Sequence, residues 1–554
     1  MKKILVTVVI FAICATLATA SFFAFAYHAD IKPTRIPPEP DYNPNDSSYY
    51  GTFDRRSTVD FSNALTDNFD GSIADFWRIV DGAWHHNENY GEGTKGNDYH
   101  NGCLKENVQL MDSYDGKDGV LALRATADSY SYHDDELTNR FKYNFSEKIT
   151  EKSDNIDSTR SGACLVTPEI YGPGRYETVM KPLPFDGTVS ALWTFQWAGN
   201  GTEQNEIDIE IVSGGAEGSY AVIWYTSWTA SNSTVSEHVK LADVDLDYFL
   251  NDGQWHKFTF DWYTDFNFSG DKRIDWFIDE KCIYSLTGEN MDIQNKISDH
   301  PGSIWLGCWL SGWSSKYTYR NWDTAYMLVD SFTYIPFTNL DGLKETSYRP
   351  TDYKLYKAVT SASSDEDDYW VKKVDSATVD SFMTQWLVNG DFENVYQGGV
   401  YIMDRENVGT GNQGYVGWVK GKIKRSYTGD INVELVDDAN TGSHALKVEA
   451  NAVAENTNVK VYDNYKFDFE MYAKLGSAES VGWIKILFRI DDDGYAQIDT
   501  TKTITLDITS TDYTKISREI VAPVGTREMI IRVGCESGSV IVDSGSMLYK
   551  GTAK

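Results

Sequence analysis

The feature that most constrains the fold is a two-residue alternation of apolar and polar side chains that recurs along most of the chain. It is clear in GVLALRAT, GRYETVMKP, EIDIEIV and RIDWFID, and it returns after residue 385 in YKFDFEMYAK and GWIKILFRI. Successive side chains of a strand point to opposite faces, so this period indicates strands with one buried face. Turn residues separate the runs and no amphipathic helical pattern stands out. We therefore predict an all-β protein built from sandwiches.

Breaks in this pattern divide the chain into five predicted segments. Lys2 and Lys3 precede an apolar run that is typical of a secretory signal peptide, and a membrane anchor is the alternative. The polar, acidic run SASSDEDDYW is typical of a linker. The segments are a signal peptide (1–26), a Pro-rich tether (27–62), a large β-sandwich (63–338), an acidic linker (339–384) and a smaller β-sandwich (385–554). We expect a secreted, extracellular protein, or a surface-anchored one if the N-terminal segment is not cleaved.

The charge of the chain excludes one class of partner. Its 82 acidic and 50 basic residues give a net charge of −32, which repels nucleic-acid phosphates and acidic membranes. Aromatic residues make up 14% of the chain, and rings suit neutral ligands such as sugars. No CxxC motif or Cys/His cluster indicates a zinc or haem site. Cys103 and Cys164 either pair in an oxidising compartment or are small buried residues. We expect a monomer.

The motif that carries chemistry is Glu206-Ile207-Asp208-Ile209-Glu210. On a strand, the three carboxylates share one face and the isoleucines share the other. A solvated strand face is the alternative, because this spacing also arises by chance in so acidic a chain. Strand residues four apart have Cα atoms roughly 13 Å apart. Side chains that lean together can approach the roughly 5–5.5 Å carboxyl separation of a retaining glycosidase.

Aromatic residues are concentrated near this motif in the sequence. Pyranose rings stack on such side chains, although packing in a core is an even alternative for each one. Trp262 and Trp276 alternate with inward residues and are expected to be structural. The candidates for substrate binding are Trp193, Trp197, Tyr225, Trp309 and Trp313, and Trp224 and Trp228 also lie nearby.

The segment YGPGRYETVMKPLPFDGTVSALWTFQWAGNGTEQNEIDIEIV resembles the core of glycoside hydrolase family 16. DNFDG, DGVLALRA, GQWHKFTFDW and SIWLGCWLSGW match in order, so the resemblance covers roughly Asn68 to Phe337. It implies a concanavalin A-like β-jelly-roll of two curved antiparallel sheets, with a cleft for β-glucan polysaccharides and a retaining mechanism. By the family motif, Glu206 is the nucleophile, Asp208 the assisting acid and Glu210 the acid/base. No cofactor is required for catalysis.

The form of the motif favours one subtype. Lichenase-like members, which cut mixed-linkage 1,3-1,4-β-glucan, carry Glu-x-Asp-x-Glu on a regular strand, whereas laminarinases usually have one extra residue, a bulge. This chain has no extra residue, and we predict a lichenase-like endo-β-glucanase. Ile211 and Gln204-Asn205 depart from the lichenase pattern. A laminarinase or xyloglucan transglycosylase-type activity, or a non-catalytic carbohydrate-binding surface protein, are the alternatives.

The C-terminal segment resembles another known family. WLVNGDFEN followed by GYVGW is similar to the opening of family 4 carbohydrate-binding modules, which have a galactose-binding-like sandwich. The resemblance implies that aromatic side chains stack on sugar, with core packing at least as common for each. It also implies a structural calcium. The stacking candidates are Trp418, Tyr472 and Trp483, and the calcium candidates are Asp391, Glu393 and Asp543.

Overall fold

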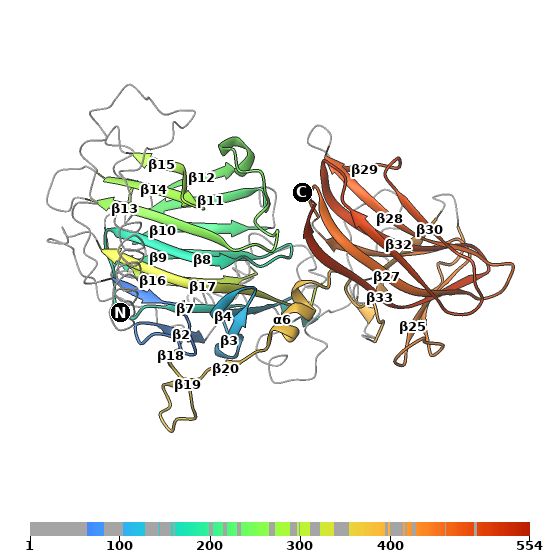
Figure 1. The fold of residues 1–554 in the computed structure, drawn as a ribbon, viewed down its shortest axis with the longest axis horizontal. Coiled ribbons are helices and arrows are strands. Elements are labelled where there is room, and N and C mark those ends of the chain that lie inside the picture. Colours follow the sequence, from blue (N-terminus) through green and yellow to red (C-terminus); the bar gives the residue numbers. More distant parts are fainter. Residues whose placement is uncertain are drawn as a thin grey trace, which may run out of the picture.

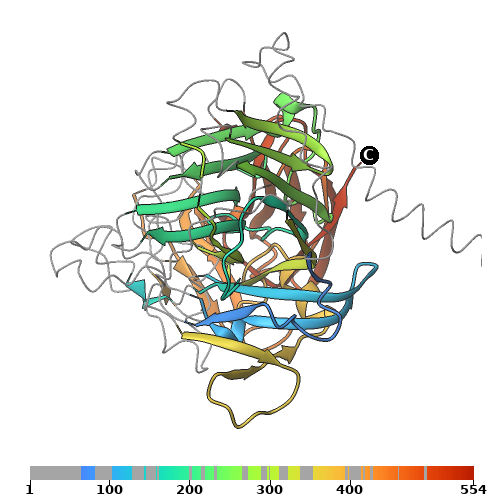
Figure 2. The same ribbon diagram turned by 90° about the vertical axis from the view of Figure 1, so that its left-hand side faces the viewer.

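The computed structural model confirms the all-β fold class: two β-sandwiches lie side by side (Figure 1). In Figure 2, which is viewed from the far end of the first sandwich, the second sandwich lies behind it. The structure describes residues 64–81, 103–127, 143–144, 157–158, 161–198, 203–213, 219–229, 234–264, 272–287, 296–298, 300–310, 322–336, 354–393, 397–398, 414–415, 418–423, 428–459, 461–491 and 496–553. The predicted signal peptide and Pro-rich tether lie outside the described residues.

The first sandwich consists of two mostly antiparallel sheets. One sheet runs β15 (Lys281–Thr287), β14 (Lys272–Ile278), β13 (His256–Thr264), β8 (Gly174–Lys181), β17 (Thr324–Pro336), β4 (Lys117–Thr126), β3 (Val108–Tyr114) and β20 (Lys372–Lys373), with β1 (Leu65–Asp67) on β17. The other runs β12 (Thr234–Lys240), β11 (Val222–Trp228), β10 (Glu203–Val212), β9 (Val189–Ala198), β16 (Ser303–Trp309), β7 (Ala163–Val166), β2 (Arg78–Asp81), β18 (Lys354–Val359) and β19 (Asp368–Trp370). Four short elements lie outside these sheets or at their ends: η3 (Lys105–Asn107), η6 (Leu241–Val244), and β5 (Tyr143–Asn144), which pairs with β6 (Asp157–Ser158).

The core of this sandwich is formed by the apolar half of each alternating run. Ile207, Ile209 and Ile211 of β10 are buried in one cluster with Phe260 and Trp276, which lie on strands of the opposite sheet. Trp262 and Trp276 are both buried there, as expected of structural residues. The cysteines expected after the signal segment, Cys103, Cys164, Cys282, Cys308 and Cys535, are buried free thiols.

The second sandwich has one large and one small sheet. The large sheet runs β21 (Gln397–Gly398), β22 (Gly414–Tyr415), β23 (Trp418–Lys422), β26 (Ala452–Val459), β32 (Thr526–Ser537), β28 (Val481–Asp491) and β29 (Ala496–Ile498), with β30 (Ile504–Ile508) on β28. The small sheet runs β24 (Val433–Val436), β25 (Ala445–Glu449), β33 (Ser539–Thr552), β27 (Tyr465–Leu475) and β31 (Thr514–Val521). Phe467, Phe469 and Met471 of β27 point inward, as the alternation predicts.

The prediction of a linker over 339–384 is wrong from residue 354 onward, because residues 354–383 belong to the first sandwich. β18 pairs with β2, and β20 pairs with β3, so this segment extends both sheets. It then forms α6 (Ser376–Met383), the one α-helix of the described residues, capped by the Asp375 side chain, which accepts from the backbone N–H of Thr378 at 2.8 Å. Most of the acidic run that suggested a linker forms the turn between β18 and β19, and its last three residues form β19 itself.

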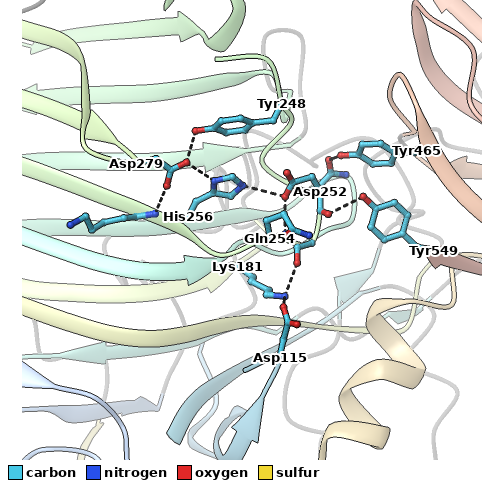
Figure 3. A network of polar contacts seen from close by, with 12 residues as sticks. Asp115, Lys181, Tyr248, Asp252, Gln254, His256, Asp279, Tyr465 and Tyr549 are labelled. Carbon is cyan, nitrogen blue, oxygen red and sulfur yellow. Dashed lines mark hydrogen bonds and ion pairs between the residues drawn. The ribbon is translucent and has the colours of Figure 1, made fainter. Parts of the chain in front are cut away.

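The two sandwiches meet through a packed junction (Figure 3). The hydroxyl of Tyr465 donates to Asn251 Oδ1 at 2.5 Å, and that of Tyr549 donates to the backbone oxygen of Asp252 at 2.9 Å. Trp386, which follows α6 directly, stacks on Tyr549 with ring centroids 4.8 Å apart. The buried core is continuous across this junction. The second sandwich is therefore docked on the first.

In the part of the chain that the structure describes, no helix is both long enough and apolar enough to cross a membrane.

Candidate functional site

β10 presents three carboxylates on the face that points away from the core. It pairs without interruption with β9 from Glu203 to Val212 and with β11 from Glu206 to Glu210, so the motif carries no bulge. This regular ladder keeps the alternation in phase, and the isoleucines enter the core. We call the opposite face, which carries Glu206, Asp208 and Glu210, the acidic face.

Burial and mutual repulsion govern the protonation of these carboxylates. Asp208 is 5% exposed, and burial raises its pKa well above the ordinary range, as do the negative charges of Glu206 and Glu210. Asp208 is also hydrogen-bonded to Glu206. Burial raises the pKa of Glu210 to about 7. At neutral pH the acidic face therefore holds protons beside an ionisable carboxylate, which suits general acid catalysis.

Tryptophans lie beside the carboxylates on the same face of the sheet. Trp193 pairs directly with Asp208 across the β9–β10 ladder, and it also pairs with Trp305 of β16. The Trp193 ring lies 5.5 Å from that of Trp305, stacked, and 5.3 Å from that of Trp309, measured between centroids. The structure thus brings the predicted Trp193 and Trp309 together on the acidic face, where both rings are buried.

Sequence reasoning missed two members of this face. Trp305 lies four residues before Trp309 in one strand, and strand residues an even number apart point to the same face. This spacing could have identified Trp305 from the sequence. His238 of β12 stacks on Trp224 with centroids 4.0 Å apart, and Trp224 pairs with Glu210. Nothing local in the sequence of β12 indicates this neighbour, because the pairing of β11 with β12 decides it.

The prediction that Tyr225 binds substrate is wrong. Tyr225 pairs with Ile209 rather than with a carboxylate, so its side chain points into the core, where it is 1% exposed and 5.3 Å from the ring of Trp276. Its neighbour Trp224 occupies the acidic face instead, since adjacent strand residues face opposite sides. Trp197 lies in β9 opposite Gln204, but its side chain is not among those that the structure describes. Trp313 lies outside the described residues.

The stacking candidates of the second sandwich are not brought together. Trp418 is 1% exposed, its ring 5.3 Å from Phe392 and its indole N–H bonded to the backbone oxygen of Asn389, so its prediction as a sugar platform is wrong. Trp483 lies on β28 of the large sheet with the Lys485 ammonium 3.9 Å from its ring centroid. Tyr472 lies on β27 of the small sheet and is partly exposed. Sugar stacking by Trp483 or by Tyr472 stays a prediction.

The calcium candidates hold a loop through backbone N–H groups. Asp543 accepts from the N–H of Asn440 at 2.7 Å and of Thr441 at 2.8 Å, and Glu393 accepts from Ser443 at 2.7 Å. Backbone N–H groups thus occupy Oδ2 of Asp543 and Oε1 of Glu393. Among the described residues, no group of three or more His, Cys, Asp or Glu side chains is arranged to hold a metal ion. The calcium site stays a prediction.

The candidate site lies in a segment of the chain that matches a known protein family. Residues 125–328 match the family Glycosyl hydrolases family 16. The beta-glucanase of Bacillus subtilis is 29% identical over 141 residues, 26% of this chain and 48% of that protein. The beta-glucanase of Paenibacillus macerans is 28% identical over 152 residues, 27% of this chain and 56% of that protein. The matched part of the chain thus spans about half the length of these curated relatives.

Among solved structures, the beta-glucanase of Bacillus licheniformis covers 50% of this chain and 99% of that chain, at 18% identity and a TM-score of 0.33. The strand pairings of this chain, rather than that likeness, establish its fold.

Proposed function

We propose that this chain, whose residues 125–328 form a domain of glycosyl hydrolases family 16, is an endo-β-glucanase that cleaves internal β-glycosidic bonds with retention. The observation that carries the proposal is the acidic face itself. Three carboxylates lie on one regular strand, beside stacked tryptophans, and the pKa of Glu210 is raised to about 7. A purely sugar-binding face has no use for three like charges placed together.

The carboxylates divide the reaction between them. Glu206 attacks the anomeric carbon while Glu210 protonates the departing glycosidic oxygen, which gives a covalent glycosyl-enzyme. Glu210, now ionised, takes a proton from the water that cleaves this intermediate and so recovers its own proton. Protonated Asp208 donates a hydrogen bond to Glu206 and favours the ionised form of the nucleophile. The product keeps the β configuration because the anomeric carbon is inverted twice.

The uninterrupted ladder of β10 supports mixed-linkage 1,3-1,4-β-glucan as the substrate, because it is the regular form of the motif. A laminarinase or transglycosylase-type activity is the alternative within the same chemistry. Secretion is part of the proposal, supported by Lys2 and Lys3 ahead of an apolar run. So is carbohydrate binding by the second sandwich, supported by its NGDFE opening.

The test is the variant Glu206→Gln, assayed on barley β-glucan, lichenan, laminarin and xyloglucan. We expect kcat to fall on the order of 1000-fold or more, because the nucleophile is lost. Glu237→Gln on exposed β12 is the matched control and should keep wild-type activity. NMR of the first-formed product should show the β anomer. Unchanged activity in Glu206→Gln, or an α product, would sink the proposal.

A further inference from the structure

An indole from the opposite sheet reaches the backbone of the acidic strand from behind. Trp276 of β14 is 1% exposed, and its Nε1–H donates to the backbone oxygen of Asp208 at 3.0 Å. A carbonyl oxygen has two lone pairs, so it can accept this bond in addition to a bond of the strand ladder. The contact therefore falls on the residue midway between Glu206 and Glu210.

The strand that carries Trp276 is irregular at this point. The pairing of β14 with β15 shifts register between Trp276 and Phe277, which is a β-bulge or an equivalent irregularity. Bulges bend a strand and re-aim a side chain, and they are over-represented next to active sites. The irregularity accompanies an indole that points across the core at β10, whereas the motif strand itself stays regular.

Two tyrosines hold the indole in this orientation. The ring centroid of Trp276 lies 5.3 Å from that of Tyr225 and 5.5 Å from that of Tyr284. The two tyrosine rings are nearly parallel, with an angle of 6° between their planes and centroids 6.3 Å apart. We call Trp276, Tyr225 and Tyr284 the aromatic brace. Its members come from β14, β11 and β15, so it ties the two sheets together behind the carboxylates.

The proposed chemistry is sensitive to the backbone at Asp208. The Cα atoms of Glu206 and Glu210 are roughly 13 Å apart on a strand, while a retaining pair needs carboxyl groups roughly 5–5.5 Å apart. The two side chains must lean together over Asp208, so a small bend of the strand at that residue changes their separation. The hydrogen bond from Trp276 reaches the Asp208 carbonyl from behind the strand and so bears directly on such a bend.

We propose that Trp276 is a positioning residue for the carboxylates of the acidic face, acting through its hydrogen bond to the backbone of Asp208. This inference rests on the proposed function for its consequence in catalysis. The placement of the carboxylates by Trp276 is independent of the proposed function, because a titration of Glu210 reports that placement without any substrate.

The experiment uses Trp276→Phe in the full chain, which keeps an aromatic ring and removes the N–H donor. Trp418→Phe is the matched control: its indole is equally buried and also donates to a backbone oxygen, at 3.1 Å, in the second sandwich. In Trp276→Phe we expect kcat on β-glucan to fall on the order of 10-fold with little change in KM. We also expect the carboxyl titration of Glu210, followed by ¹³C NMR, to shift by about half a pH unit or more.

The outcomes separate the two proposals. A shifted Glu210 titration in Trp276→Phe, with the control unshifted, supports the positioning role even if the wild type proves inactive on every glucan. An unshifted titration in a folded Trp276→Phe protein overturns it, whatever the activity. If Trp276→Phe does not fold, 3-benzothienylalanine at position 276 keeps the indole shape without the N–H, and the same two results decide. Persistent activity in Glu206→Gln contradicts the proposed function alone.

Discussion

One proton on Glu210 links the structure of the site to its proposed rate. Burial raises the pKa of this carboxyl to about 7, so the acid form is populated at neutral pH and disappears above it. We expect kcat/KM to fall about tenfold per pH unit on the alkaline side of pH 7, since the leaving oxygen then lacks its proton donor. Initial rates on a soluble β-glucan between pH 4 and pH 9 measure this limb.

The variant Glu210→Gln tests whether Glu210 causes that limb. On an activated aryl glycoside, whose leaving group needs no proton, the variant should still release the aryl group in a first burst, and this release should not decline above pH 7. A limb that persists unchanged in Glu210→Gln would assign the titration to another group.

The raised pKa of Glu210 also makes the stability of the fold depend on pH. Because the folded pKa is raised, the stability contributed by the proton is present at pH 4 and is lost as pH rises through about 7.

α6 shows how one short element can change the role of a whole segment. Val379 of this helix is fully buried against Met111, Tyr326 and Leu328, on the outer face of the sheet that contains β3, β4 and β17. Helix and strand patterns are hard to distinguish in so short a segment, and the neighbouring acidic run suggested a solvated linker. The buried contact instead makes residues 354–383 part of the first sandwich.

We expect Val379→Asp to destabilise the first sandwich by several kcal/mol, because it places an unpaired carboxylate in that apolar contact. Urea denaturation followed by tryptophan fluorescence measures the change. Ser381→Asp, on the exposed side of the same helix, should change stability by less than about 0.5 kcal/mol. Equal, small effects of the two substitutions would mean that α6 does not contribute to the fold.

At the scale of the whole molecule, a buried histidine supports the loop of the first sandwich that contacts the second (Figure 3). His256 is 4% exposed, with Nε2 3.2 Å from Asp252 and Nδ1 2.9 Å from Asp279. Burial alone would lower its pKa, but hydrogen bonds to these two carboxylates raise it to about 9. The ring also stacks on Tyr248, whose hydroxyl donates to Asp279. The backbone of Asp252 accepts from Tyr549 of the second sandwich, so the charged histidine supports the docking contact.

A raised folded pKa sets the sign of the pH dependence. The stabilisation is complete below about pH 6.5, the ordinary histidine value, and is lost as pH rises through about 9. The free energy of unfolding should therefore fall by up to on the order of 3 kcal/mol over that window. Denaturant titrations at several pH values measure this fall. His256→Gln should flatten it, and His444→Gln, a partly exposed histidine of the second sandwich, should not. An identical fall in His256→Gln would refute the assignment.

The sequence by itself determined the strands, their inward faces and the acidic motif, because alternation is a local property of a strand. Because alternate residues of a strand share one face, the sequence places Glu206, Asp208 and Glu210 on the same side of β10. The turn residues mark most breaks between strands. Tertiary structure decided which neighbouring strands pair and how the sheets stack. Strand pairing turned Trp224 toward the carboxylates and Tyr225 away from them, and sheet stacking placed Trp276 behind Asp208. Packing against a distant sheet likewise folded residues 354–383, since such contacts join residues far apart in the chain and leave no local pattern.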